Sequence, residues 1–129
     1  MYEVGLSKSF TAWHVMPGVP GPEGIRHQYE YRLDVVVSRQ ELDEREMVVD
    51  IVLLQEVLDQ VVGGIAGQDL ERILPPEGTA VTVEYLAKWT FDQISPEIAA
   101  GGADDLAVRA WESPDAFGGY FDRIDKTSL

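Results

Sequence analysis

Two stretches near the start of the chain alternate between apolar and polar residues. In residues 27–37, HQYEYRLDVVV, the odd positions are apolar, aromatic or histidine, and most even positions are polar. Residues 2–14 alternate in the same manner, and a period of two is typical of strands with one buried face. Residues 16–24, MPGVPGPEG, can only form a loop. We therefore expect a hairpin in which His14 and His27 meet near one edge.

Two later segments have the apolar spacing of helices. Asp50 is the expected N-cap of the first helix, which weakens at Gly63 and Gly64, and Thr82 is the expected N-cap of the second, which Pro96 ends. Residues 67–78, rich in Gly, Pro and acidic residues, predict a loop between them. The apolar stripes are Ile51, Leu54, Leu58, Val61 and Ile65 in the first helix, and Val83, Leu86, Ala87, Thr90 and Ile94 in the second.

The last part of the chain returns to strand patterns. Residues 106–113 alternate, with Glu112 in line with Leu106, Val108 and Ala110, and residues 118–124, GGYFDRI, predict a short final strand. The order strand, strand, helix, helix, strand, strand predicts an α+β fold: a four-stranded antiparallel sheet with two helices on one face. The length suits a single domain spanning residues 1–129.

Composition removes several classes of function. The 23 acidic and 10 basic residues give a formal charge of −13, which argues against nucleic acid as a partner because the phosphates would be repelled. No apolar run approaches the ~20 residues of a membrane span, and the first ten residues lack the order of a signal peptide, so we expect a cytoplasmic protein. The absence of cysteine excludes disulfides, thiolate zinc sites and cysteine nucleophiles.

His14 and His27 are candidate metal ligands because imidazole is a common ligand of zinc. A zinc site usually has at least three protein ligands, and Tyr29 is the third candidate on the same strand face. A phenol has an ordinary pKa near 10 and must lose its proton to bind a metal well. The alternative is a pair of histidines hydrogen-bonded within a polar edge of the core.

Glu112 is a candidate ligand-binding residue because an unpaired carboxylate on an apolar strand face is costly to bury. Held there, it can accept two N–H bonds from a flat N–C–NH2 edge such as that of a pterin or guanine. The alternative is a glutamate at an exposed strand end. Asp69 and Glu84 have simpler interpretations, as a loop acid and as an acid in the first turn of a helix.

Five segments together resemble the 6-pyruvoyl tetrahydropterin synthase and 6-carboxytetrahydropterin synthase family. They are FTAWH at 10–14, HQYEY at 27–31, MVVDIVLLQEVL at 47–58, TVEYLAKW at 82–89 and VRAWE at 108–112, in the family's order and spacing. The resemblance implies a T-fold, in which a four-stranded sheet backed by two helices joins other copies edge to edge into a barrel. It also implies a homo-oligomer, with a hexamer favoured, and sites between subunits.

The resemblance implies a zinc site that is incomplete here. In active relatives three histidines hold zinc, one from the first strand and two from an HGH motif that opens the second. His14 and His27 match two of them, whereas Tyr29 stands at the third position and Gln28 replaces the intervening glycine. The expectation is therefore that zinc is a possible cofactor with its third ligand missing.

The proton-transfer residues also differ from the family pattern. The family's cysteine lies in the loop before the second strand, where this chain has Glu23 nearby. Asp69 matches the aspartate of the family's Asp-His pair, while Leu70 replaces the histidine, which leaves Asp69 as the surviving candidate catalytic residue. The family's reaction on dihydroneopterin triphosphate, in which zinc polarises oxygens while cysteine and histidine move protons, is not expected by that mechanism.

The ligand anchor is retained. Glu112 matches the glutamate that grips the amino-pyrimidine edge of the pterin, and Thr82 with Glu84 matches a Thr-x-Glu element of the same pocket. We expect a protein that binds a pterin or a related heterocycle and whose ancestral lyase activity is lost or altered. One alternative is an active lyase of pterin biosynthesis in which His14 and His27, with Tyr29 or Glu23, hold a metal. The others are a non-catalytic oligomeric scaffold for a biosynthetic partner and an unrelated α+β domain.

Overall fold

The sheet of the protein has four antiparallel strands in sequence order, as the alternation predicts. A computed structural model describes residues 1–74, 78 and 80–129. Its strands are β1 (Tyr2–His14), β2 (His27–Arg39), β3 (Asp105–Ser113) and β4 (Ala116–Arg123). Each strand pairs only with its neighbours, in the order β1-β2-β3-β4, so that β1 and β4 are the two edges of this sheet.

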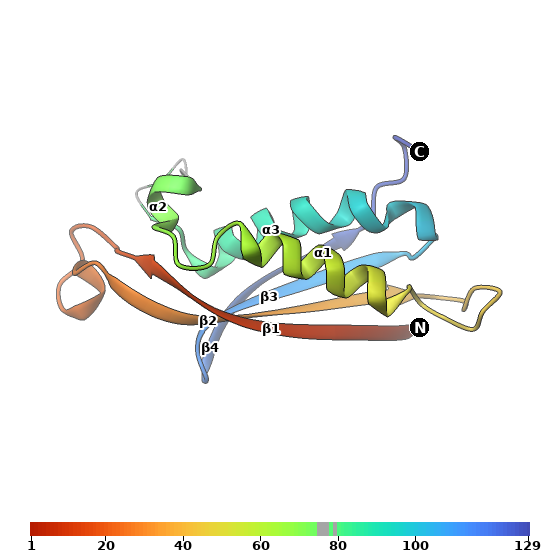
Figure 1. Cartoon of the computed structure of the whole chain (residues 1–129), viewed down its shortest axis with the longest axis horizontal. Coiled ribbons are helices and arrows are strands. Elements are labelled where there is room, and N and C mark those ends of the chain that lie inside the picture. Colours follow the sequence, from red (N-terminus) through yellow and green to blue (C-terminus); the bar gives the residue numbers. More distant parts are fainter. Residues whose placement is uncertain (75–77, 79) are drawn as a thin grey trace.

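Two long helices cover one face of the sheet. Figure 1 shows α1 (Ile51–Gly63) and α3 (Val83–Ile98) side by side on that face, with α2 (Leu70–Ile73) beside the end of the sheet where β1 turns into β2. Short 3-10 turns occur at η1 (Pro22–Gly24) and η2 (Ala99–Gly101). The predicted α+β architecture is confirmed.

The core lies between the sheet and the two long helices. Alternate residues of the three strands β1, β2 and β3 face inward, and the apolar stripes of α1 and α3 pack on them. Side chains that are at most 2 % exposed form its centre: Ala12, Tyr31, Leu33, Val35, Val37, Leu54, Leu58, Leu86, Ile94, Leu106, Val108 and Ala110. Burial of this continuous apolar layer is the main stabilising contribution to the fold.

The predicted helix caps are confirmed, while three details of the prediction are wrong. Residues 67–78 are not entirely loop, because Leu70 is fully buried and anchors α2. Helix α3 continues past Pro96 to Ile98, since a proline in the last turn removes only one hydrogen bond and Ile98 is buried in the core. Ile51, placed on the buried stripe of α1, is 45 % exposed because it lies in the first turn.

The chain between α1 and α2 runs along the outer edge of β1. The Gly67 N–H donates to the Thr11 carbonyl at 2.7 Å, and the Trp13 N–H donates to the Gln68 carbonyl at 2.8 Å. These bonds cover the edge of β1 near its end and place α2 next to His14. None of the helices in the described residues is both long and apolar enough to cross a membrane.

Gly118 of β4 lies directly under the first turn of α3, which makes it a test of this packing. A Cβ atom at that position would stand 2.7 Å from Val83 Cγ2 and 2.9 Å from the Glu84 nitrogen. We expect Gly118→Ala to lower the free energy of unfolding by about 1–3 kcal/mol through overpacking, measured by urea denaturation. Gly63→Ala is the control, since a Cβ there meets nothing within 4 Å. Equal stability of the two variants would contradict this packing.

Candidate functional site

The two histidines face each other across the β1–β2 pair, as predicted. His14 and His27 are Cα partners in the ladder, where His14 is 2 % exposed and His27 is half-buried. The Tyr29 ring stacks on the His27 ring with centroids 4.1 Å apart and meets the His14 ring edge-on at 5.2 Å. Two imidazoles and one phenol therefore share one strand face, at the end of the sheet.

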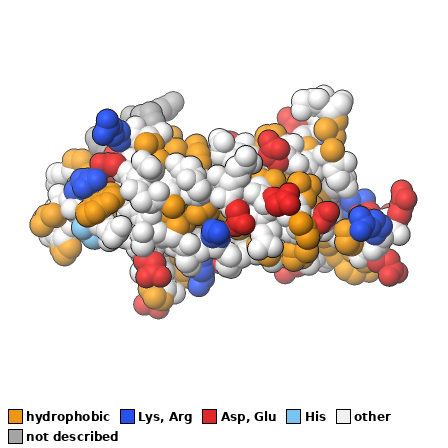
Figure 2. Space-filling view, viewed as in Figure 1, with side chains coloured by type: hydrophobic (Ala, Val, Ile, Leu, Met, Phe, Trp, Pro, Cys, Tyr) orange, Lys and Arg blue, Asp and Glu red, His pale blue; other side chains and the backbone are white. Residues whose placement is uncertain are grey.

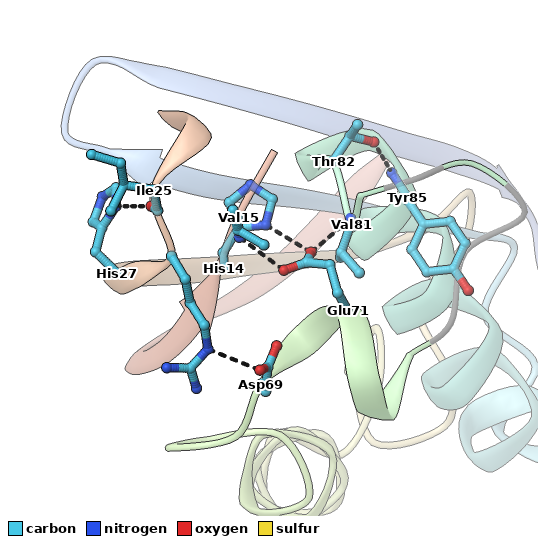
Figure 3. A network of polar contacts seen from close by, with 10 residues as sticks. His14, Val15, Ile25, His27, Asp69, Glu71, Val81, Thr82 and Tyr85 are labelled. Atoms are coloured by element: carbon cyan, nitrogen blue, oxygen red, sulfur yellow. Dashed lines mark hydrogen bonds and ion pairs between the residues drawn. The ribbon is translucent and has the colours of Figure 1, made fainter. Parts of the chain in front are cut away.

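A carboxylate from α2 holds His14 in place. In Figure 3, Glu71 Oε2 lies 2.8 Å from His14 Nδ1 and accepts from the Val81 N–H at 2.8 Å, while Oε1 accepts from the Val15 N–H at 2.9 Å. Glu71 thus joins the end of β1, helix α2 and the segment before α3. Sequence reasoning missed this residue because it falls in a stretch that predicts only loop.

The hydrogen bonds of the two histidines determine which ring nitrogen is available. His27 Nδ1 lies 2.8 Å from the Ile25 carbonyl oxygen, and His14 Nδ1 lies 2.8 Å from the Glu71 carboxylate. Because a carbonyl and a carboxylate can only accept, the proton of each hydrogen bond is on Nδ1 of the histidine. The other nitrogen of the His14 ring points away from Glu71 (Figure 3). When neutral, both rings therefore present an Nε2 lone pair, the arrangement seen in metal-binding histidines whose second nitrogen is hydrogen-bonded.

Tyr29 does not supply a good third metal ligand. Burial, and then the charges of Glu23, Glu112 and Glu71, raise the pKa of the Tyr29 phenol above its ordinary value of 10.0. The phenol therefore keeps its proton at neutral pH, whereas a metal requires the phenolate. Within the described ranges, no three histidine, aspartate or glutamate side chains converge closely enough to hold a metal ion. The residues present do not fit the three-nitrogen zinc site of active relatives.

Asp69 is engaged in a separate ion pair. Its Oδ2 accepts from Arg26 Nε at 2.9 Å, and the Arg26 guanidinium lies 4.4 Å from the centroid of the Trp13 ring. Asp69 also immediately precedes α2 without capping it through its side chain. The aspartate expected as the catalytic acid or base therefore has a cation as its partner, and its role in catalysis stays a prediction.

Glu112 lies where the pairing of β3 with β4 is irregular. The register shifts between Trp111 and Ser113, which places Glu112 in a bulge, a feature that redirects side chains and recurs beside active sites. Glu112 is half-buried, and its side chain makes no hydrogen bond or ion pair with the described residues. It lines a shallow cavity of about 320 Å³, together with Ser9, Glu30, Tyr31, Arg32, Trp111, Ser113 and Pro114.

Thr82 and Glu84 lie at the start of α3. The Thr82 hydroxyl accepts from the Tyr85 N–H at 3.1 Å, so it caps the helix (Figure 3). Thr82 is exposed. Glu84 is also exposed, with its carboxylate against Gly118, whose partner on β3 is Ala110. Glu84 therefore lies against β4, the strand next to the one that carries Glu112. Neither Thr82 nor Glu84 makes a side-chain hydrogen bond to Glu112. Their roles in ligand binding remain predictions.

Solved structures of similar fold include several pterin enzymes. The 6-pyruvoyl tetrahydropterin synthase of Plasmodium falciparum superposes with a TM-score of 0.74 at 12% identity, over 95% of this chain and 98% of that chain. The Caenorhabditis elegans enzyme gives 0.72 at 18% identity, over 92% and 94%. A Plasmodium vivax enzyme with a catalytic glutamate replaced by cysteine gives 0.74 at 12% identity, over 95% and 98%. No curated protein sequence matches the chain.

The fold of these structures confirms the expected T-fold. At these identities the likeness shows the architecture alone, so the family assignment rests on the sequence. The family described as 6-pyruvoyl tetrahydropterin synthase matches residues 3–122, which is nearly the whole chain. This chain therefore belongs to the 6-pyruvoyl tetrahydropterin synthase family.

Proposed function

We propose that the protein binds a pterin or a closely related heterocycle through Glu112, and that the lyase chemistry of its family is lost or altered in it. The observation that supports this most directly is the state of Glu112. It is a half-buried carboxylate in a strand bulge, beside the aromatic side chains of β2, without a partner among the described residues. A half-buried carboxylate without a partner is stabilised by a ligand that donates hydrogen bonds to it.

The chemistry of the anchor favours a flat, nitrogen-rich ring. An ionised carboxylate accepts two parallel N–H bonds from an N–C–NH2 edge, and such charge-assisted pairs are stronger than neutral ones. Tyr29 and Tyr31 lie in a stacked series with His27, with centroids 4.1 and 5.8 Å apart along β2. Tyr31 is 2 % exposed and belongs to the core, so the half-buried Tyr29 is the member of this series that a ligand beside Glu112 could contact. An aromatic side chain near a carboxylate suits a flat, nitrogen-rich ring better than a sugar or an aliphatic acid.

The groups that would carry the family's reaction are changed. There is no cysteine in the chain, Leu70 is buried where the family has a histidine, and Asp69 is paired with Arg26. The metal donor set holds two imidazoles and a protonated phenol. These departures support loss or alteration of activity.

A metal-dependent lyase with a modified site is the alternative function. The Plasmodium vivax enzyme has a glutamate as a catalytic residue, and in this chain Glu23 lies in the loop before β2, close enough for its charge to act on Tyr29. In that alternative His14 and His27, with Tyr29 or Glu23, hold the metal, and Asp69 is the acid or base. The poor third ligand weighs against it.

We also infer that the protein is a homo-oligomer, with a hexamer favoured and its sites shared between copies. The last strand, β4, is a sheet edge, and Phe121 and Phe117 on it are 79 % and 46 % exposed. Exposed aromatic side chains on an unpaired edge are a typical surface for strand pairing between subunits. If the protein forms an oligomer but binds no pterin, the result would instead favour a non-catalytic scaffold for a biosynthetic partner.

Binding through Glu112 is tested by titration calorimetry with neopterin. We expect saturable binding to the wild-type protein and a loss of about 1–3 kcal/mol in Glu112→Ala, the cost of removing a buried hydrogen-bonding partner. Asp115→Ala is the matched control, since it removes the same charge from the neighbouring turn, where the side chain is exposed. Equal affinity of wild type and Glu112→Ala would refute the anchor, and no binding at all would favour the scaffold.

Zinc content separates the two functions. Protein purified without chelators is expected to hold less than about a tenth of an equivalent of zinc, because only two nitrogen donors are present. Tyr29→His places a third imidazole on the same strand face and is expected to raise the content to roughly one equivalent. Tyr29→Phe, which adds no donor, is expected to stay at the wild-type level. If the wild-type protein holds zinc and Tyr29→Phe does not, the metal-dependent alternative is established.

Assembly is tested by sedimentation. The wild-type protein is expected to sediment at several times the monomer mass of 14.3 kDa. Phe121→Lys is expected to shift it towards smaller species, because a charge would have to be buried at the strand edge. Gln93→Lys on the exposed side of α3 adds the same charge and is expected to change nothing. A monomeric wild type contradicts the inference.

A further inference from the structure

The cavity beside Glu112 opens where β3 ends and β2 continues. Arg32 and Trp111 form the last pair of the β2–β3 ladder, so residues 27–31 of β2 have no partner on β3 within the described chain. Arg32 and Trp111 alternate with buried core residues, and they therefore lie on the face of the sheet opposite the helices. In Figure 1 the turn between β3 and β4 projects on that side, and Figure 2 shows acidic and apolar side chains together on the projection. A ligand can therefore enter the cavity from the face that the helices leave uncovered.

The Arg32 guanidinium is held at the wall of this cavity by two partners. Its Nε and Nη2 donate to the Asp34 carboxylate at 3.1 and 3.4 Å, and its carbon lies 4.5 Å from the centroid of the Trp111 ring. Asp34 is itself fixed, because it also accepts from the Ser7 hydroxyl at 2.6 Å and from Trp111 Nε1 at 2.7 Å. The orientation of the guanidinium is therefore set before a ligand binds.

Arg32 and Glu112 line the same cavity without forming an ion pair. The carboxylate that pairs with Arg32 is Asp34, and Arg32 Nη1 makes no hydrogen bond in the described part of the chain. A donor group and a carboxylate acceptor thus share one cavity, and both come from one copy of the chain. Groups of opposite charge that are kept apart in this way leave room for a ligand that presents an acceptor next to a donor.

We propose that Arg32 is a specificity-determining residue of this site, and that it donates a hydrogen bond to the ring oxygen that adjoins the N–C–NH2 edge held by Glu112. This inference rests on the proposed function and adds a second recognition group to it. In pterin and guanine a carbonyl oxygen lies next to the ring N–H of that edge, so one side of the ring presents both an acceptor and donors. Arginine suits such an oxygen, since it is the common partner of the same oxygen of guanine in nucleic-acid recognition.

The test compares pterin with its 4-thio analogue by titration calorimetry on the intact protein. The analogue keeps the N–C–NH2 edge and replaces the ring oxygen by sulfur, which accepts hydrogen bonds only weakly. We expect the wild-type protein to bind pterin about ten times more tightly, because a hydrogen bond from a charged donor is weakened in the analogue. We expect Arg32→Met to bind the two compounds within about threefold of each other, since no donor remains at this position.

Arg109→Met is the matched control. The Arg109 guanidinium lies on the same face of the sheet, 4.6 Å from the centroid of the Phe117 ring, but Arg109 does not line the cavity. We expect Arg109→Met to keep the wild-type preference for the oxygen compound. Arg32→Lys keeps the charge and a donor without the planar fork of arginine, and we expect it to bind pterin with a reduced preference.

The results separate this inference from the proposed function. If Arg32→Met or Arg32→Lys leaves the ratio of the two affinities at the wild-type value, Arg32 has only a structural role and the inference fails. Equal binding of the two compounds by the wild-type protein, or a loss of the preference in Arg109→Met, also overturns it. In each of these cases weaker pterin binding by Glu112→Ala leaves the proposed function intact. If the wild-type protein binds neither compound, the proposed function fails and this inference fails with it.

Discussion

The register between β1 and β2 is the constraint on which the site depends. The two strands pair along their whole thirteen-residue length, so the ladder fixes His14 opposite His27 and places Tyr29 diagonally across from His14. A slip of one residue would turn these side chains to the opposite face of the sheet and expose the apolar set that packs on the helices. The burial of Leu33, Val35 and Val37 therefore also aligns the histidines.

Much of the fold follows from the sequence because its signals are local. The alternation in residues 2–14 and 27–37 and the caps at Asp50 and Thr82 each act within a few residues, and the elements form where these signals place them. The departures arise where tertiary packing overrides local preference. Leu70 makes a short helix in a segment rich in loop-forming residues, and the buried Ile98 extends α3 beyond its proline.

The candidate site is less predictable because its contacts are distant in sequence. The hairpin pattern is enough to bring His14 and His27 together, but the partner of His14 is Glu71, which is 57 residues away and carries no recognisable spacing. Similarly, the pairing of Asp69 with Arg26 spans 43 residues. Alternation places Glu112 on the inward face of β3, whereas the bulge in which it lies depends on how β4 pairs with β3.

The three bonds accepted by Glu71 tie the chemistry of His14 to the local stability of α2. A helix of four residues cannot persist by its own hydrogen bonds, so α2 is held by the burial of Leu70 and by the Glu71 carboxylate. Opening of α2 would release the imidazole from its fixed tautomer and its orientation in one event. Conversely, any molecule that engages the outer nitrogen of His14 would slow that opening, because ligands stabilise the conformation they bind. The rigidity of this corner would then vary with occupancy, although no part of α2 need touch the bound molecule.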